Sequence, residues 1–159
     1  MTLNYSTKTY GENMSRAQGR NLSISTKNSV EICRSLRNKN LQKGKKFLEN
    51  VISMEEPVPY ARYNQDTAHR RGMGPGRYPI NAAKEILTIL KSAESNAQSK
   101  GLNTSKMVIV HINAHKASVP WRYGRQRRRK AKRTHIEVVL SEVEAEQKAE
   151  KAPKKEIKK

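Results

Sequence analysis

The sequence predicts a fold of helices and strands with a protruding hairpin, because helical and strand patterns alternate with a strongly basic segment along the chain. Helical patterns fill most of the chain between residues 28 and 100, and strand patterns follow at Met107–His115 and His135–Leu140. The two strands bracket Lys116–Arg133, in which half of the residues are basic. Because its like charges repel one another, this segment cannot form a packed core. The strands on either side of it predict that it forms the arm of a long hairpin.

The composition predicts one small domain with tails and a polyanionic partner. The chain of 159 residues has 33 basic and 14 acidic residues, a net charge of +19, and is only 35% hydrophobic. This charge indicates nucleic acid first and an anionic membrane surface second. We expect neither a membrane span nor a signal peptide, because no apolar run is long enough and the N-terminus lacks an apolar stretch. The single Cys33 excludes an internal disulfide and fits a reducing compartment.

The first part of the chain is predicted to contain a short strand and two helices. Residues 1–19 are polar and expected to be extended, and Arg20–Thr26 alternates as a strand does. Asn28 is expected to cap the first helix, with Glu31 in the capping-box position. Apolar residues at helical spacing predict its buried face, namely Val30, Cys33 and Leu36. The second helix is predicted over Leu41–Ser53, with Leu41, Gly44, Leu48 and Val51 on one face.

The middle of the chain predicts an irregular basic segment followed by a long helix. Val58–Tyr78 is rich in arginine and punctuated by glycine and proline. Pro79 suits the first turn of a helix over Ile80–Lys100, and Gly101 fits the position just past its end. The apolar stripe of this helix predicts that it packs on the core; it comprises Ile80, Ala83, Ile86, Leu87, Leu90, Ala93 and Ala97.

The two strands of the hairpin are predicted from alternating side chains. In Met107–His115 one face carries Val108, Val110, Ile112 and Ala114, and the other carries Met107, Ile109, His111, Asn113 and His115. The partner strand alternates at Ile136, Val138 and Leu140. Half of the eighteen-residue arm, at about 3.3 Å per residue, would project roughly 30 Å.

The hairpin arm predicts binding to nucleic acid. Lys116–Arg133 contains nine basic residues and no acid, and the acid-free stretch extends from Ser95 to Ile136. Trp121 and Tyr123 lie among these charges and can stack on bases or sugars. A solvated, disordered basic loop is the alternative interpretation. The predicted phosphate contacts and stacking residues of the arm are Lys116, Trp121, Arg122, Tyr123, Arg125, Arg127, Arg128, Arg129, Lys130, Lys132 and Arg133.

A second group of predicted contacts lies outside the arm. The segment Gly72–Pro79 lacks the Gly-Lys-Ser/Thr ending of a P-loop, so it is interpreted as a loop whose backbone comes close to RNA. An ordinary connecting loop is the alternative. The further residues predicted to contact RNA are Arg20, Arg62, Tyr63, Asn64, His69, Arg70, Arg71, Arg77, Tyr78 and His115.

No pattern in the sequence predicts catalysis, a metal site or a cofactor. His111 and His115 are four residues apart on a strand, a spacing that does not converge on a metal ion as it would on a helix. Glu55 and Glu56 are adjacent and cannot flank a substrate. A free DNA- or RNA-binding regulator and a cationic nuclease are alternative functions for a chain of this charge. The near balance of charge on the Ile80–Lys100 helix speaks against the regulator, and the acid-free stretch against the nuclease.

An ordered set of motifs resembles a known family, the universal large-subunit ribosomal protein L twenty-two family (L seventeen in eukaryotes), in its archaeal–eukaryotic branch. The motifs span roughly residues 4–143 and are Val58-Pro59 with Arg62-Tyr63-Asn64, Gly76-Arg77-Tyr78-Pro79, Ala93-Glu94-Ser95-Asn96-Ala97, Lys100-Gly101-Leu102, His111-Ile112 through His115-Lys116-Ala117, Gly124-Arg125 and Thr134-His135-Ile136-Glu137. The chain departs from the family pattern between Lys116-Ala117 and Gly124-Arg125, where it is several residues shorter and Arg122-Tyr123 replaces the usual Arg-Ala.

The resemblance implies a fold, a function and a set of partners. The implied fold is α+β, with three helices packed on a small antiparallel sheet. A long β-hairpin at Met107–Leu140 is implied to cross the large-subunit rRNA and to line the nascent-peptide exit tunnel. The implied function is that of a structural, non-enzymatic constituent of the cytoplasmic large ribosomal subunit, which binds several domains of the large-subunit rRNA and supports assembly. Neighbouring ribosomal proteins, and the nascent peptide near the hairpin tip, are the other implied partners. The expected organisation is an extended segment 1–19, a single rRNA-binding domain 20–143, and a charged tail 144–159 that is disordered unless bound.

Overall fold

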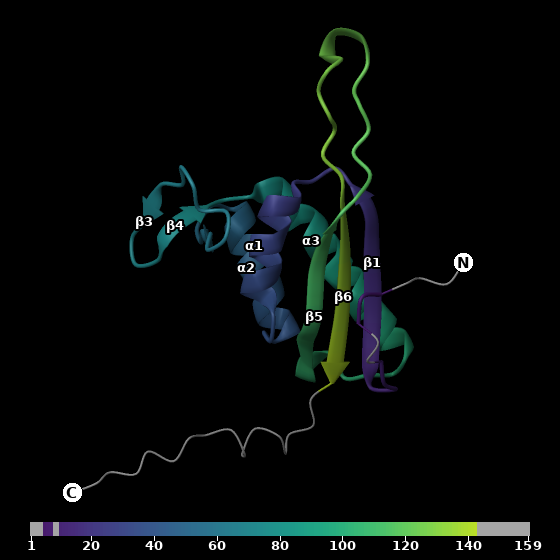
Figure 1. The fold of residues 1–159 in the computed structure, drawn as a ribbon. Helices are drawn as coiled ribbons and strands as arrows, with labels where there is room; N and C mark the ends of the chain where they lie inside the picture. Colours follow the sequence, from purple (N-terminus) through teal and green to yellow (C-terminus); the bar gives the residue numbers. More distant parts are fainter. Residues whose placement is uncertain (1–4, 8–9, 143–159) are drawn as a thin grey trace, which may run out of the picture.

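A three-stranded antiparallel sheet forms the centre of the molecule (Figure 1). A computed structural model of the chain describes residues 5–7 and 10–142, so the predicted tail 144–159 lies outside it. The strand order is β1 (Met14–Leu22), β6 (Thr134–Glu142), β5 (Met107–Lys116), so the hairpin strands β5 and β6 are neighbours and β1 pairs with β6. The predicted antiparallel hairpin is confirmed.

Helices α1 (Thr26–Leu36), α2 (Leu41–Ile52) and α3 (Ile80–Ser99) build the core with this sheet. Helix α3 packs on β1 and β6, α1 packs on β5, and α2 packs on α3. Most of the predicted apolar stripes are the faces that meet, since Leu36, Leu48, Ile86 and Leu90 are fully buried. On α1 the prediction was partly wrong, because Val30 is only partly buried and the fully buried Ile32 was not predicted. Leu87 is partly buried against the same core. The predicted α+β fold with three packed helices is therefore confirmed.

The first strand begins earlier than the sequence indicated. Residues Met14–Gly19 belong to β1 and pair with β6, whereas the expected strand was Arg20–Thr26. Only Leu22 of the expected alternating pair lies in the strand, and Ile24 is buried in the connection to α1. The segment Met14–Gly19 has few apolar residues, so it lacks the sequence pattern of a strand. Ser15 is nevertheless buried, and its Oγ donates a hydrogen bond to the carbonyl of Ala93 (3.1 Å). A polar side chain thus occupies a position where a pattern search expects an apolar one.

The predicted cap of α1 is wrong. The helix begins at Thr26 after Ser25, so Asn28 lies inside its first turn. Glu31 does not reach back to the helix start; its fully buried carboxylate accepts hydrogen bonds from the loop that follows α2 and β2 (Val58–Pro59). The second helix is capped as its sequence allows, because the side chain of Asn40 accepts a hydrogen bond from the amide of Gln42 (2.9 Å).

A β-bulge in β5 corrects the predicted alternation of that strand. The register shifts between Ile109 and His111, so Met107 and Ile109 share the buried face with Ile112. Val110 stands at the shift and is 47% exposed. An extra residue in one strand moves all later side chains to the opposite face, which strict alternation cannot anticipate.

The segment predicted to be irregular contains a second, small sheet. Its strand order is β2, β4 (Gly74–Arg77), β3 (His69–Arg70), and both pairings are antiparallel. These strands are very short and rich in glycine and proline, so the sequence lacks a strand pattern there. In Figure 1 the small sheet lies on the side of α1 and α2 that faces away from the large sheet.

Helix α3 ends where the glycine predicted. Gly101 has a positive φ of 75° and donates its amide to the carbonyl of Gln98 (2.9 Å), while the amide of Leu102 reaches the carbonyl of Ala97 (3.1 Å). This pair of bonds satisfies carbonyls that the helix leaves open, and only a residue tolerant of positive φ can make it. The short 3₁₀ turn Thr104–Lys106 then leads into β5.

Candidate nucleic-acid interface

The hairpin is an ordered arm that extends beyond the sheet (Figure 1). Regular pairing of β5 with β6 ends at Lys116 and Thr134. Beyond these residues, backbone hydrogen bonds still join the two sides of the arm. They run from the amide of Ala117 to the carbonyl of Arg133 (3.2 Å), from the amide of Ala131 to the carbonyl of Pro120 (2.9 Å), and from the amide of Arg122 to the carbonyl of Arg129 (2.8 Å). The arm is therefore held in position by its own backbone and is not a free loop.

The base of the arm is tied to the body of the protein. Thr134 is fully buried, and its hydroxyl donates to the carbonyl of Ile24 (3.0 Å) and lies 2.8 Å from the hydroxyl of Thr26. These bonds join β6 to the connection between β1 and α1. The buried contacts of Thr134 with Ile24 and Thr26 thus fix the direction in which the arm leaves the sheet.

The tip is a tight turn built on two residues with positive φ. A 3₁₀ turn, Gly124–Gln126, begins at Gly124 (φ 62°) and is closed by the amide of Arg127, which donates to the carbonyl of Gly124 (3.2 Å). Arg128 follows with φ 71°. This backbone turns the arm back on itself and directs consecutive arginines outward from one end.

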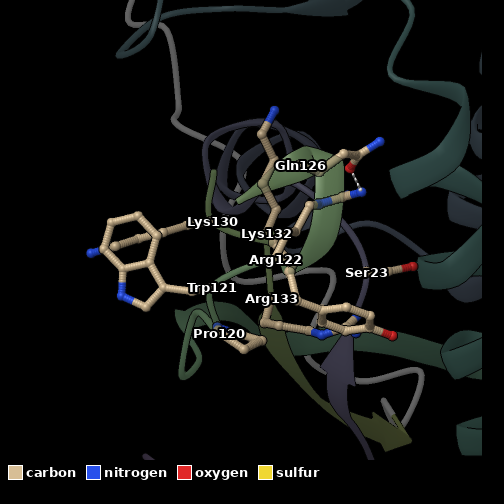
Figure 2. Close-up of a pocket in the computed structure, with 10 residues that line it drawn as sticks. Ser23, Pro120, Trp121, Arg122, Gln126, Lys130, Lys132 and Arg133 are labelled. Carbon is tan, nitrogen blue, oxygen red and sulfur yellow. Dashed lines mark hydrogen bonds between the residues drawn. The ribbon is translucent and has the colours of Figure 1, made fainter. Parts of the chain in front are cut away.

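Most side chains of the arm are exposed, and several of them contact one another. Trp121 is 63% and Tyr123 93% exposed. The Nζ of Lys130 lies 4.4 Å from the centre of the Trp121 ring, and Arg122 donates to Gln126 (2.6 Å). Figure 2 shows Trp121 and Lys130 on one side of an open pocket that Pro120 and Arg133 also line. An exposed aromatic ring beside a cation offers both a stacking face and a charge to a nucleotide.

No acidic side chain compensates the charge of the arm. Within residues 5–7 and 10–142, the ion pairs join Lys45 to Glu94, and His111 and His115 to Glu137, and none involves the arm. Like charges at this density repel one another in water. The arm therefore carries uncompensated guanidinium groups, a type of group that can donate paired hydrogen bonds to an anion.

The second predicted group lies on and around the small sheet. Arg62, Asn64, His69, Arg70, Arg71 and Arg77 are exposed there, while Tyr63 and Tyr78 are partly buried. The guanidinium of Arg70 lies 5.3 Å from the centre of the Tyr78 ring, and Arg77 donates to the carbonyl of Asp66 (2.9 Å). The positive charges therefore face solvent, while the two tyrosine rings help to hold the loops.

The loop that carries Arg62 is anchored to the carboxylate of Glu31. Oε1 accepts from the amides of Arg62 and Tyr63, both at 2.9 Å, and Oε2 accepts from the amide of Ala61 (3.2 Å). The neighbouring Tyr60 is 3% exposed, and burial raises the pKa of its phenol to about 12. A rigid, largely buried support thus lies beneath exposed cationic side chains.

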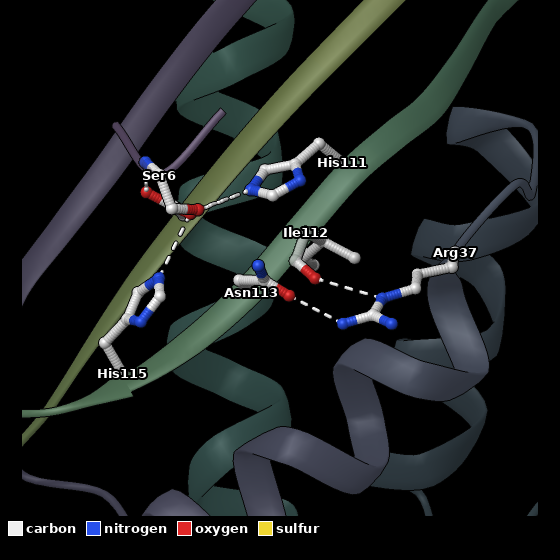
Figure 3. Close-up of polar contacts among 7 residues, drawn as sticks. Ser6, Arg37, His111, Ile112, Asn113 and His115 are labelled. Atoms are coloured by element: carbon white, nitrogen blue, oxygen red, sulfur yellow. Dashed lines mark hydrogen bonds and ion pairs between the residues drawn. The ribbon is translucent and has the colours of Figure 1, made fainter. Parts of the chain in front are cut away.

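A carboxylate also organises the base of the hairpin. Glu137 accepts hydrogen bonds from the amide of Ser6 (3.0 Å) and from the rings of His111 (2.7 Å) and His115 (3.1 Å) (Figure 3). The two rings converge on one carboxylate oxygen, which the sequence spacing did not suggest. No group of three or more His, Cys, Asp or Glu among the residues that the structure describes could hold a metal ion.

His115 and Arg20, which are both predicted contacts, lie near this carboxylate. His115 is bonded to Glu137 but keeps 45% of its side chain exposed. The Nε of Arg20 donates to the Oε1 of Gln18 (3.1 Å), and Arg20 and His115 line one open pocket with His135. The two residues are thus brought together at the foot of the arm.

The structure divides the predicted contacts between two regions. The arm projects from one end of the sheet, and the small sheet lies beside the helices (Figure 1). One open pocket is lined by residues of both regions, by Tyr78 from the small-sheet region and by Lys132 from the arm. Sequence reasoning missed the two residues that support these regions, Glu31 and Glu137. For Glu31 a signal was available, because a glutamate on the buried face of a helix needs hydrogen-bond partners inside the protein. No helix among the described residues is long and apolar enough to cross a membrane.

Comparison with known proteins supplies the family. Residues 17–141 match the family described as ribosomal protein L22p/L17e. A protein of Ignicoccus hospitalis is 45% identical over 76% of this chain and 83% of its own length, and one of Methanocaldococcus jannaschii is 42% identical over 88% and 95%. A protein of Staphylothermus marinus is 37% identical over 90% and 99%. Each relative is named large ribosomal subunit protein uL22. The chain therefore belongs to the ribosomal protein L22p/L17e family.

Proposed function

We propose that this protein is a structural, non-enzymatic constituent of the large ribosomal subunit that binds large-subunit rRNA. The observation that carries the proposal is the ordered hairpin arm of Lys116–Arg133, which has nine exposed or half-exposed cations, two exposed aromatic rings and no acid. The relatives' names support the ribosomal setting. The mechanism is neutralisation of packed rRNA phosphates by a preformed arm, with the small-sheet region as a second contact.

Removal of the tip charges tests this proposal. Replacing Arg127, Arg128 and Arg129 by alanine should leave the circular dichroism and the melting temperature unchanged, because all three side chains are exposed. The rRNA affinity should fall, and the slope of log affinity against log salt should decrease by roughly two to three, since each phosphate contact contributes about 0.7–0.9. Incorporation of the variant into large subunits should weaken.

A matched control removes the same charge elsewhere. Lys43, Lys46 and Lys91 are exposed on α2 and α3, away from both regions, so their replacement by alanine should change affinity and incorporation much less. Equal losses in the two triple variants would show that only net charge matters. Unchanged co-sedimentation of the tip variant with large subunits at moderate salt would refute the proposed contact.

We also propose that the tip faces the nascent-peptide exit tunnel. Support comes from the paired backbone of the arm, which can carry Gly124–Gln126 away from the body without bending freely. The native thiol of Cys33 is buried, so a cysteine introduced at Arg125 would be the reactive one. A photo-crosslinker attached there should capture nascent chains in stalled ribosomes, whereas one at exposed Ser95 should not. Equal capture from both positions would contradict a tunnel location.

A further inference from the structure

We infer that Glu31 is a positioning residue for RNA contact: its buried carboxylate holds the Ala61–Asn64 turn in the shape that presents Arg62 and Asn64. The inference rests on the proposed function, because it concerns how one of the two proposed rRNA contacts is preorganised. Glu31 lies on α1 and touches no solvent, so it cannot meet RNA itself. Its effect on binding must therefore pass through the loop.

The hydrogen bonds of Glu31 specify the path of the loop backbone. Three consecutive amides, those of Ala61, Arg62 and Tyr63, point at one carboxylate over distances of 2.9–3.2 Å. Successive amides converge on an anion only when the backbone curls around it. A chain that curls in this way turns the side chains of Arg62 and Asn64 toward solvent, where both are exposed.

The charge of Glu31 is balanced by these amides alone. In the described part of the chain no Lys, Arg or His nitrogen lies within ion-pair distance of its carboxylate. A buried carboxylate without such bonds would be strongly destabilising, and amides without an acceptor would be left unsatisfied. The carboxylate and the loop therefore depend on each other, and the turn is fixed as long as the bonds are intact.

Other contacts on the loop are consistent with a rigid support. Lys27 lies one helical turn before Glu31 on α1, and its Nζ is 5.6 Å from the centre of the Tyr63 ring, while the guanidinium of Arg62 is 5.5 Å from the same centre. Tyr63 itself packs against the core. At the far end of the loop, the carbonyl of Asp66 accepts a hydrogen bond from Arg77 (2.9 Å). The loop is thus fastened at both ends, with its cations left outside.

Filling the space between α1 and the loop would not by itself need a carboxylate at this position. Among residues 5–7 and 10–142, the hydrogen-bond partners of the Glu31 side chain are loop amides, and none belongs to another helix or to the large sheet. An apolar side chain of similar volume could fill the space between α1 and the loop, but it could not orient three amides. The choice of glutamate is explained by orientation of the loop.

The test uses Glu31→Gln, with Glu94→Gln as the control. Glutamine keeps the shape, but its amino group meets an amide that also donates, so the turn should open. Glu94 pairs with Lys45 on the surface of α2 and α3 and does not touch the loop. The readouts are hydrogen exchange of the amides of residues 61–63, affinity for protein-free large-subunit rRNA, and hydroxyl-radical protection of that rRNA.

The expected result separates the loop from the arm. In Glu31→Gln the amides of residues 61–63 should exchange faster. If the competent turn falls to about a tenth of the population, affinity through it should fall about tenfold. Protections that depend on Arg62 should disappear, while those that depend on Arg127–Arg129 should remain. Glu94→Gln should change none of the three readouts.

A second variant keeps the test decisive if Glu31→Gln does not fold. Ala61→Pro removes one amide donor at an exposed position and leaves the buried charge in place, so it should shift the same protections to a smaller extent. Faster exchange with unchanged affinity and protections in either folded variant would overturn the inference. Absence of specific protections in the unmodified protein would instead refute the proposed function.

Discussion

Glu137 and His111 form a close pair at the foot of the hairpin, with 2.7 Å between Oε1 and Nε2. Glu137 belongs to the central strand β6 and is 2% exposed, and His111 follows the bulge of β5. The same carboxylate binds the amide of Ser6, so it joins the N-terminal segment to the two strands that carry the arm. Its charge should therefore contribute to the stability of the fold.

Acid should weaken this link. Burial by itself would raise the pKa of Glu137, but hydrogen bonds from His111, Ser6 and His115 outweigh it and lower the pKa from 4.5 to about 2. Because the pKa is lower in the folded state, the stabilisation is complete above about pH 4.5 and is lost as pH falls toward 2. Relative to Glu137→Gln, it should be on the order of 3 kcal/mol at neutral pH.

Urea unfolding followed by circular dichroism at several pH values measures this difference. The gap in unfolding free energy between the unmodified protein and Glu137→Gln should close between pH 4.5 and pH 2. A gap that stays constant over this range would show that the charge of Glu137 is not responsible for it.

Replacing Gly19 by alanine should destabilise the packing of β1 on α3. A Cβ at Gly19 would lie 2.6 Å from the Cδ1 of Ile89 and 3.0 Å from the Cδ1 of Leu22. Both of these atoms are the ends of side chains that can turn aside, so the cost should lie toward the lower end of the range of about 1–3 kcal/mol that overpacking spans. Thermal unfolding should show the loss, and Ile89→Val, which removes the closest atom, should restore part of it. Gly11→Ala is the control, since a Cβ there meets nothing within 4 Å.

Cys33 should be unreactive in the folded protein. It is 1% exposed, and burial raises the pKa of its thiol to about 12, so almost no thiolate is present near pH 8. Labelling with a thiol reagent should be slow in buffer and rapid in concentrated urea. A cysteine introduced at exposed Ser95 should react quickly under both conditions. Rapid labelling of Cys33 in buffer would mean that α1 opens far more often than its packing suggests.

Trp121 should report RNA binding and remain nearly silent during unfolding. It is the only tryptophan of the chain, and it lies on the arm with 63% of its surface exposed. Its fluorescence should be typical of a solvated indole and should be quenched when rRNA stacks on it. Urea should change the circular dichroism with little shift of the emission. Emission that is unaffected by saturating rRNA would place Trp121 outside the contact.

The long elements of the fold could be predicted, and so could the hairpin. Helix α3 follows its apolar stripe from Pro79 to Gly101, because periodic burial and end signals agree there. The small sheet could not be predicted, since β2, β3 and β4 have too few residues for a period of two to be visible. The bulge in β5 was missed for a related reason: one extra residue leaves no mark in composition, yet it brings Ile112 to the buried face of Met107 and Ile109 and leaves Val110 exposed.

The two candidate regions show the same division. The exposed cations of the arm follow from charge density alone, and their role as contacts stays a prediction. The carboxylates that hold the regions in place were not visible as such, because Glu31 and Glu137 find their partners far along the chain. The sequence spacing predicted that Glu31 belongs to a capping box with Asn28. That role is ruled out because α1 begins at Thr26, so Asn28 lies inside the helix.

The sequence by itself determined the charge of this protein, its helices and the presence of a basic hairpin, because these depend on composition and on short-range periodicity. Only the tertiary structure decided which buried carboxylate holds which loop. Glu31 meets Arg62 and Glu137 meets Ser6 and His111 across long stretches of chain. A buried charge takes its partners from whatever amides and rings the packed fold brings within about 3 Å, and that geometry does not exist until the helices and the sheet have come together.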